Sequence, residues 1–137
     1  MSQKTVICVC GGGNGAHVLA GLASAADNVQ VRVLTLYADE AQRWTAAADN
    51  QPLVVHFQLE GQPPRDDLRA PGPVLVTKDA AAALAGVHIV VLTVPAFAHA
   101  QYFAAMAPHL EAGVIVAGMP GRPGFEFEAR FHLGEKM

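Results

Sequence analysis

The sequence predicts a single α/β domain built on a doubly wound, mostly parallel sheet. Short runs of β-branched and apolar residues alternate along the 137 residues with segments of helical periodicity. The first such run, 5–10, is apolar almost throughout, as in strands buried on both faces of a parallel sheet. A composition of 52% hydrophobic and 15% charged residues is that of a folded domain rather than a disordered segment.

The first half of the chain alternates regularly between strand and helix. The strand expected over 5–10 leads into a helix over 16–26, in which leucine and valine recur at helical spacing. A turn follows, and then a strand over 29–36 with alternating valines. The next helix, 39–48, begins with two acidic residues, which the helix dipole favours at that end.

The second half starts less regularly. The short apolar segment 53–59 predicts a strand, and the stretch 60–73, rich in proline and glycine, predicts a loop. After it the alternation returns. The expected strands are 74–77, 87–94 and 113–117, and the expected helices are 79–85, 97–110 and 125–133.

A glycine-rich segment stands between the first strand and the first helix. It fits the G-x-G-x-x-G/A pattern of Rossmann-type dinucleotide-binding loops, with Gly11, Gly13 and Ala16 at the three defined positions. Gly11 allows the tight turn, Gly13 leaves room for a pyrophosphate beside the backbone, and Ala16 lets the helix pack close to the strand. We expect the helix N-terminus to offer its N–H groups to the phosphates, although a turn without a ligand stays open. The other residues expected to line this site are Gly12, Asn14 and Gly15.

The residues after the second strand bear on the choice of cofactor. In this fold an acidic residue about twenty positions beyond the glycines binds the adenosine ribose. The second strand ends near Leu36, which we expect at the site, and Asp39 is the first acid after it. Asp39 either binds the ribose diol or caps the following helix. Arg43, the only nearby base for a 2′-phosphate, lies one turn into that helix, so the pattern favours NAD over NADP.

Charge and cysteine content exclude several classes of partner. The net charge is -3 and the basic residues are scattered, which predicts neither a nucleic-acid nor a membrane partner. The sequence shows no apolar stretch long enough for a bilayer and no signal-peptide pattern. Cys8 and Cys10 are expected on one face of a strand as reduced core residues, which predicts a cytoplasmic protein. The histidines show no metal-ligand spacing, so no metal site is expected.

Four segments together resemble the N-terminal NAD-binding domain of the opine dehydrogenase family, in its octopine dehydrogenase-like form. They are VCGGGNGAH, VRVLTLYADEAQRW, LTVPAFAHAQYFAAMAPHL and GFEFEAR. The resemblance implies an NAD-dependent oxidoreductase acting on CH–NH bonds, which condenses an amino acid with pyruvate and reduces the imine with NADH. It also implies that the amino-acid site and the catalytic histidine lie in a further, helical domain outside residues 1–137. We therefore assign no catalytic residue, and we expect these 137 residues alone to be inactive.

The same resemblance implies that the loops after the later strands border the ligands. Val94, Pro95 and Ala96 are expected beside the cofactor, since ligands lie beyond the carboxyl ends of such strands. Met119 and Arg122, which follow the last strand, are candidates for the substrate side of the cleft.

Two alternatives stay open. Dehydrogenases of the glycerol-3-phosphate or ketopantoate reductase type share the glycine loop and the Val-Pro turn, and a stand-alone nucleotide-sensing module would need the loop alone. Two histidines near these loops, His17 and His99, are either ordinary helix residues or neighbours of the cofactor.

Overall fold

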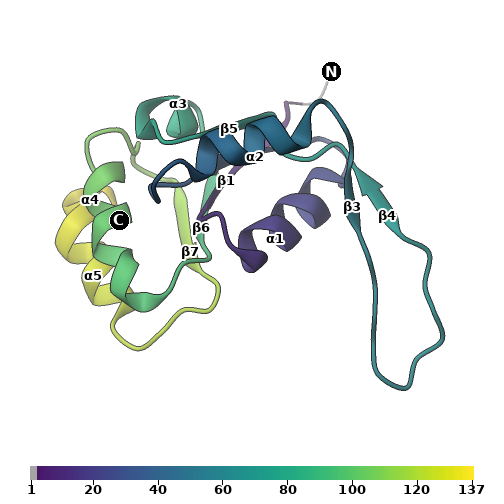
Figure 1. Ribbon diagram of the computed structural model, residues 1–137. Helices are drawn as coiled ribbons and strands as arrows, with labels where there is room; N and C mark the ends of the chain where they lie inside the picture. Colours follow the sequence, from purple (N-terminus) through teal and green to yellow (C-terminus); the bar gives the residue numbers. More distant parts are fainter. Residues whose placement is uncertain (1–2) are drawn as a thin grey trace.

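The computed structural model describes residues 3–137 as a five-stranded parallel sheet with helices on both faces (Figure 1). The strands of this sheet are β1 (Thr5–Cys10), β2 (Val29–Leu34), β5 (Leu75–Thr77), β6 (Ile89–Leu92) and β7 (Ile115–Gly118). The helices are α1 (Asn14–Ser24), α2 (Glu40–Ala48), α3 (Ala80–Leu84), α4 (His99–Met106) and α5 (Phe125–Leu133), with 3₁₀ turns at Ala96–Ala98 and Gly134–Lys136. The strand order is β5-β2-β1-β6-β7, so the chain starts in the middle and winds outward in both directions. This confirms the doubly wound, Rossmann-type α/β fold.

The central strand β1 is buried on both faces, which explains its nearly continuous apolar sequence. Cys8 and Cys10 face the core shared with α3, α4 and α5, while Val9 faces the core shared with α1 and α2. Both cysteines are free thiols with no exposed surface, on one face of the strand as expected. A hydrogen bond with Cys8, and then burial, raises the pKa of the Cys10 thiol well above its ordinary value. Both thiols therefore serve as packing residues.

The segment between α2 and β5 differs from the expectation. The strand expected over 53–59 and the loop expected over 60–73 form an antiparallel hairpin, in which β3 (Leu53–Val55) pairs with β4 (Leu68–Ala70). The connecting loop extends away from the body of the molecule (Figure 1). The three residues of β4 alternate between apolar and charged but are too few to predict a strand, and they form one by pairing with β3 and packing on α1. A side chain at Gly21 of α1 would lie 2.7 Å from Val55 and 2.8 Å from Leu53, so its absence lets the hairpin approach.

The boundaries of two helices also differ from those expected from the sequence. The helix expected over 97–110 starts as a 3₁₀ turn and its α-helical part ends at Met106, because Pro108 has no amide N–H with which to continue the helical hydrogen bonds. The first helix begins at Asn14 rather than at 16, with Gly13 as its N-cap. Within residues 3–137 we find no helix that is long and apolar enough to cross a bilayer.

Two phenylalanines of the same region provide a test of this core. Phe103 of α4 has no exposed surface, whereas Phe97 is 90% exposed. Replacing Phe103 with Ala should lower the free energy of unfolding by about 3–5 kcal/mol, because it leaves a cavity among α4, α5 and the sheet. Replacing Phe97 with Ala should change it by about 0.5 kcal/mol or less. Urea unfolding of both variants decides this, and equal losses would contradict the packing described here.

Candidate functional site at the carboxyl edge of the sheet

The five parallel strands end at one edge of the sheet, and the direction of winding reverses between β1 and β6. In open α/β sheets this switch point is where ligands bind. Backbone hydrogen bonds hold the glycine loop there. The Gly11 amide donates to Leu34 at 2.9 Å, and the Thr93 amide and hydroxyl donate to the Cys10 carbonyl at 2.9 and 3.0 Å. The loop therefore has a fixed position between β2 and β6.

Gly11 and Gly13 meet different constraints within this loop. Gly11 has φ +126°, and a methyl group on it would lie 2.9 Å from both Thr93 Oγ1 and Val94 Cγ1. Backbone conformation and space therefore both require glycine there. Gly13 has φ -83°, and a side chain on it would have no atom within 4 Å. The space over Gly13 is open, which suits the approach of a ligand to the backbone.

The N-terminus of α1 points into that open space. The first-turn N–H groups of an α-helix have no acceptor within the helix, and no side chain caps them here. Asn14 and Gly15 are exposed, and Ala16 is fully buried where α1 packs on the sheet, as expected. Free N–H donors at the positive end of a helix dipole are suited to binding an anion. The residues present therefore fit a pyrophosphate.

His17 supports the loop from the first turn of α1. Its Nδ1 lies 2.9 Å from the Gly13 carbonyl oxygen, so this nitrogen carries the proton and donates. Its ring stacks on Trp44 of α2 at 3.6 Å between centroids with 7° between the planes. Sequence reasoning missed this contact, because the two residues lie on different helices.

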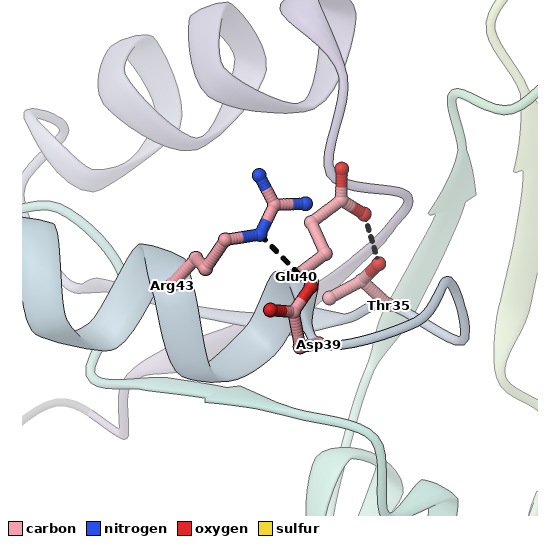
Figure 2. Close-up of polar contacts among 4 residues, drawn as sticks. All are labelled: Thr35, Asp39, Glu40 and Arg43. Atoms are coloured by element: carbon pink, nitrogen blue, oxygen red, sulfur yellow. Dashed lines mark hydrogen bonds and ion pairs between the residues drawn. The ribbon is translucent and has the colours of Figure 1, made fainter.

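The two acids at the start of α2 face different partners (Figure 2). Asp39 pairs with Arg43 at 2.9 Å, and both side chains are about 60% exposed, at 61% and 62%. Glu40 accepts a hydrogen bond from the Thr35 hydroxyl. A methyl group at Gly12 would overlap the Glu40 carboxylate, so Glu40 lies against the glycine loop. The structure therefore brings Glu40 to this loop, and ties the expected ribose ligand Asp39 to Arg43.

Leu36, which follows β2, has its amide at the same edge and donates to the Tyr102 hydroxyl at 3.1 Å. Burial raises the pKa of Tyr102 above its ordinary value. Hydrogen bonds with Leu36 and with the Thr35 side chain oppose the shift, and the charges of Cys10 and Glu40 add to it. Tyr102 is therefore a neutral hydroxyl at ordinary pH, buried beside the end of β2.

A buried histidine forms a hydrogen bond with the loop after β6. His99 is 1% exposed, and its Nε2 lies 3.2 Å from the Val94 carbonyl oxygen, to which it donates. Its Nδ1 lies 4.0 Å from Glu128 of α5. Pro95 and Ala96, the next two residues, are exposed at the mouth of the switch point. His99 thus supports the expected cofactor loop rather than facing a ligand.

The loop after β7 carries the two candidates for the substrate side. The Met119 amide donates to Leu92 at 2.8 Å, which keeps the start of this loop beside β6. The Met119 side chain is 47% exposed, and Arg122 is exposed, with its carbonyl accepting from Phe125 at 3.0 Å. Both residues are therefore near the carboxyl edge, and the guanidinium is free of ion pairs within the described part of the chain.

A cleft at the end of β5 does not include the glycine loop. It has a volume of about 680 Å³ between α2 and the end of β5, and its lining includes Asp39, Gln42, Thr77 and Lys78. The loop residues do not line it, so we assign the site from the loop's geometry and not from the size of this cleft. Among residues 3–137 no group of three or more His, Cys, Asp or Glu side chains is arranged to hold a metal ion.

No protein-family model matches the chain, but individual relatives match it closely. Octopine dehydrogenase from Pecten maximus is 50% identical over 132 residues, which are 95% of this chain and 32% of that protein. Tauropine dehydrogenase from Arabella iricolor is 50% identical over 123 residues, 90% of this chain and 30% of that protein. The chain thus spans about a third of the length of the curated relatives it matches, and over that span it is homologous to the opine dehydrogenases.

Solved structures agree. The structure of octopine dehydrogenase in complex with NADH and agmatine matches with a TM-score of 0.91 at 47% identity, over 97% of this chain and 32% of that one. Other structures of that enzyme hold NADH with L-arginine or with pyruvate. A glycerol-3-phosphate dehydrogenase from Coxiella burnetii, at 20% identity and a TM-score of 0.69, shares the fold alone. The homology is therefore to the NADH-binding region of octopine dehydrogenase, as the sequence resemblance indicated.

The contrast between the two glycines predicts different responses to the same change. Gly11→Ala should lower the free energy of unfolding by about 1–3 kcal/mol, because it forces a methyl group into a strained backbone conformation and against Thr93. Gly13→Ala should change it by about 0.5 kcal/mol or less, because the gain from a less flexible unfolded chain is offset by the poorer capping of α1 by alanine. Urea unfolding measures both, and a loss at Gly13 as large as that at Gly11 would refute this description of the loop.

Proposed function

We propose that this chain is the NAD(H)-binding part of an opine dehydrogenase, which reductively condenses an amino acid with pyruvate. The observation that supports this most is the combination of an open Gly13 and an uncapped α1 N-terminus at the switch point of the sheet. It occurs in a chain that is half identical to octopine dehydrogenase over 95% of its length.

The proposed site is built from three segments at the carboxyl edge. The glycine loop and the α1 N-terminus hold the pyrophosphate, the segment from the end of β2 to the start of α2 holds the adenosine ribose, and the loop after β6 borders the nicotinamide. The cofactor, when bound, supplies a hydride. The proposed cofactor-binding residues are Gly11, Gly12, Gly13, Asn14, Gly15, Ala16, Leu36, Val94, Pro95 and Ala96, with an acid of the Asp39-Glu40 pair at the ribose.

The proposed substrate side lies next to the nicotinamide, where the loop after β7 follows the neighbouring strand. The exposed guanidinium of Arg122 suits the carboxylate of a keto acid such as pyruvate, because it offers paired donors in a planar fork. Met119 would form the apolar wall beside it. This chain supplies one wall of the cleft, and we propose that the amino-acid site and the proton donor lie in the part of the enzyme beyond the matched third. The two free, buried thiols support a reducing compartment, and we propose the cytoplasm.

Binding of NADH by this chain tests the cofactor site. Gly13→Val places a branched side chain where the phosphates approach, so NADH should bind at least about 100-fold more weakly, which corresponds to about 2.7 kcal/mol. The fold should be unaffected, because no atom lies within 4 Å of a Cβ at this position. Calorimetric titration with NADH, paired with urea unfolding of both proteins, gives the answer. Equal affinity in two folded proteins would eliminate the proposed pyrophosphate site.

A measurement of activity tests whether the amino-acid site and the proton donor lie outside this chain. With NADH and pyruvate, the 137-residue chain should not consume NADH when arginine, alanine, glycine, taurine or β-alanine is added, because imine reduction needs a proton donor and two oriented substrates. A chimera that joins this chain to the remaining two thirds of the Pecten maximus enzyme should consume NADH with at least one of them. Absorbance at 340 nm follows the reaction. Steady amino-acid-dependent turnover by this chain alone would contradict the proposal and make Arg122 the first residue to replace.

A further inference from the structure

We propose that Glu40 is the carboxylate that makes this site select NADH over NADPH, and that Thr35 is the residue that positions it. The inference rests on the proposed NADH site. It assigns the selection to one of two adjacent acids and names a residue for it that no nucleotide-binding pattern includes.

The first argument is the position of the Glu40 carboxylate. It lies so close to the backbone of Gly12 that a methyl group there would overlap it. In the proposed site, the segment from the end of β2 to the start of α2 would hold the adenosine ribose, and Glu40 is the acid of that segment that lies against the glycine loop. A carboxylate accepts hydrogen bonds from both hydroxyls of a diol, and these charge-assisted bonds are stronger than neutral ones.

The second argument is the fixed geometry that Thr35 imposes. Thr35 has no exposed surface, and its amide donates to the Thr77 carbonyl at 3.0 Å, so its backbone is anchored between the ends of β2 and β5. Its hydroxyl donates to Glu40. A threonine hydroxyl has one proton, so this hydrogen bond commits the Thr35 hydroxyl to Glu40. The carboxylate of Glu40 is thus held by a buried side chain whose backbone is fixed to the sheet.

The third argument is what Asp39 does instead. Its carboxylate is paired with Arg43 one turn along α2, and both side chains are largely in solvent, where such a pair has little energetic effect (Figure 2). The pairing also engages Arg43, the base on α2 that a 2′-phosphate would otherwise use. The charges of Asp39 and Arg43 therefore neutralise each other. Glu40 has no such ion pair among the described residues, so its negative charge remains next to the glycine loop.

The consequence for the cofactor is electrostatic. The 2′-phosphate of NADPH carries about two negative charges at neutral pH and would replace a hydroxyl that donates to Glu40. NADPH would therefore lack this hydrogen bond to Glu40. Its phosphate would also be repelled by a carboxylate that the hydrogen bond from Thr35 holds in place. We therefore expect NADH to bind at least about tenfold more tightly than NADPH.

The test is the ratio of the NADPH and NADH dissociation constants, measured by calorimetric titration of this chain and four variants. Glu40→Gln keeps the shape of the side chain and removes its charge, so the ratio should fall from tenfold or more to within about threefold of one. Thr35→Val keeps the shape and removes the hydroxyl, so the ratio should fall at least about threefold. Thr35→Ser keeps the hydroxyl and should restore the original ratio.

The matched control is the double variant Asp39→Asn/Arg43→Gln, which removes the neighbouring ion pair without changing the net charge. Its ratio should match that of the unmodified chain. A loss of selectivity in this control, or an unchanged ratio in Glu40→Gln, would overturn the inference while NADH binding upholds the proposed function. An unchanged ratio in a folded Thr35→Val variant would overturn the role of Thr35. Failure of the unmodified chain to bind NADH would overturn the proposed function and this inference together.

Discussion

The geometry of this site depends on one turn, at Gly11, where the chain leaves β1. The residue has a positive φ and lies against Thr93 and Val94 at the end of β6, so it admits no side chain. The turn leads the chain directly into α1, and the uncapped end of that helix consequently lies at the switch point, beyond the ends of β1 and β6. Two side chains hold the residues that follow this turn. His17 holds the Gly13 carbonyl, and Glu40 covers Gly12 from the side of α2.

Helix α4 connects the two halves of the sheet at this edge. Its first residue, His99, donates to the Val94 carbonyl on one side of the switch point, and Tyr102, one turn later, accepts from the Leu36 amide on the other. A single helix from the second half of the chain thus holds loops that follow β6 and β2. Both side chains are buried, so their polar atoms must be satisfied within the protein, and the loops satisfy them.

The sequence was enough to predict the sheet and the glycine loop because each depends on local pattern. The apolar run of β1 and the spacing of Gly11, Gly13 and Ala16 are readable without tertiary contacts. The β3–β4 hairpin was not predictable, since three residues between charged and proline-rich stretches become a strand through pairing with β3 and packing on α1. The distinction between Asp39 and Glu40 was not predictable either. Asp39 is the N-cap of α2 and Glu40 is its first residue, so their side chains point in different directions. The hydrogen bond from the buried Thr35, five residues before Glu40, holds Glu40 rather than Asp39 against the loop.

The stack of His17 on Trp44 makes this loop optically visible. The chain has one tryptophan, so its emission comes from a single place, in ring contact with the histidine that holds the Gly13 carbonyl. A shift of the glycine loop would move that imidazole against the indole and change the quantum yield. A reduced nicotinamide held at the same edge would absorb in the range where the indole emits. The protein therefore contains an intrinsic fluorophore beside the glycine loop, and spectroscopy on it needs no added label.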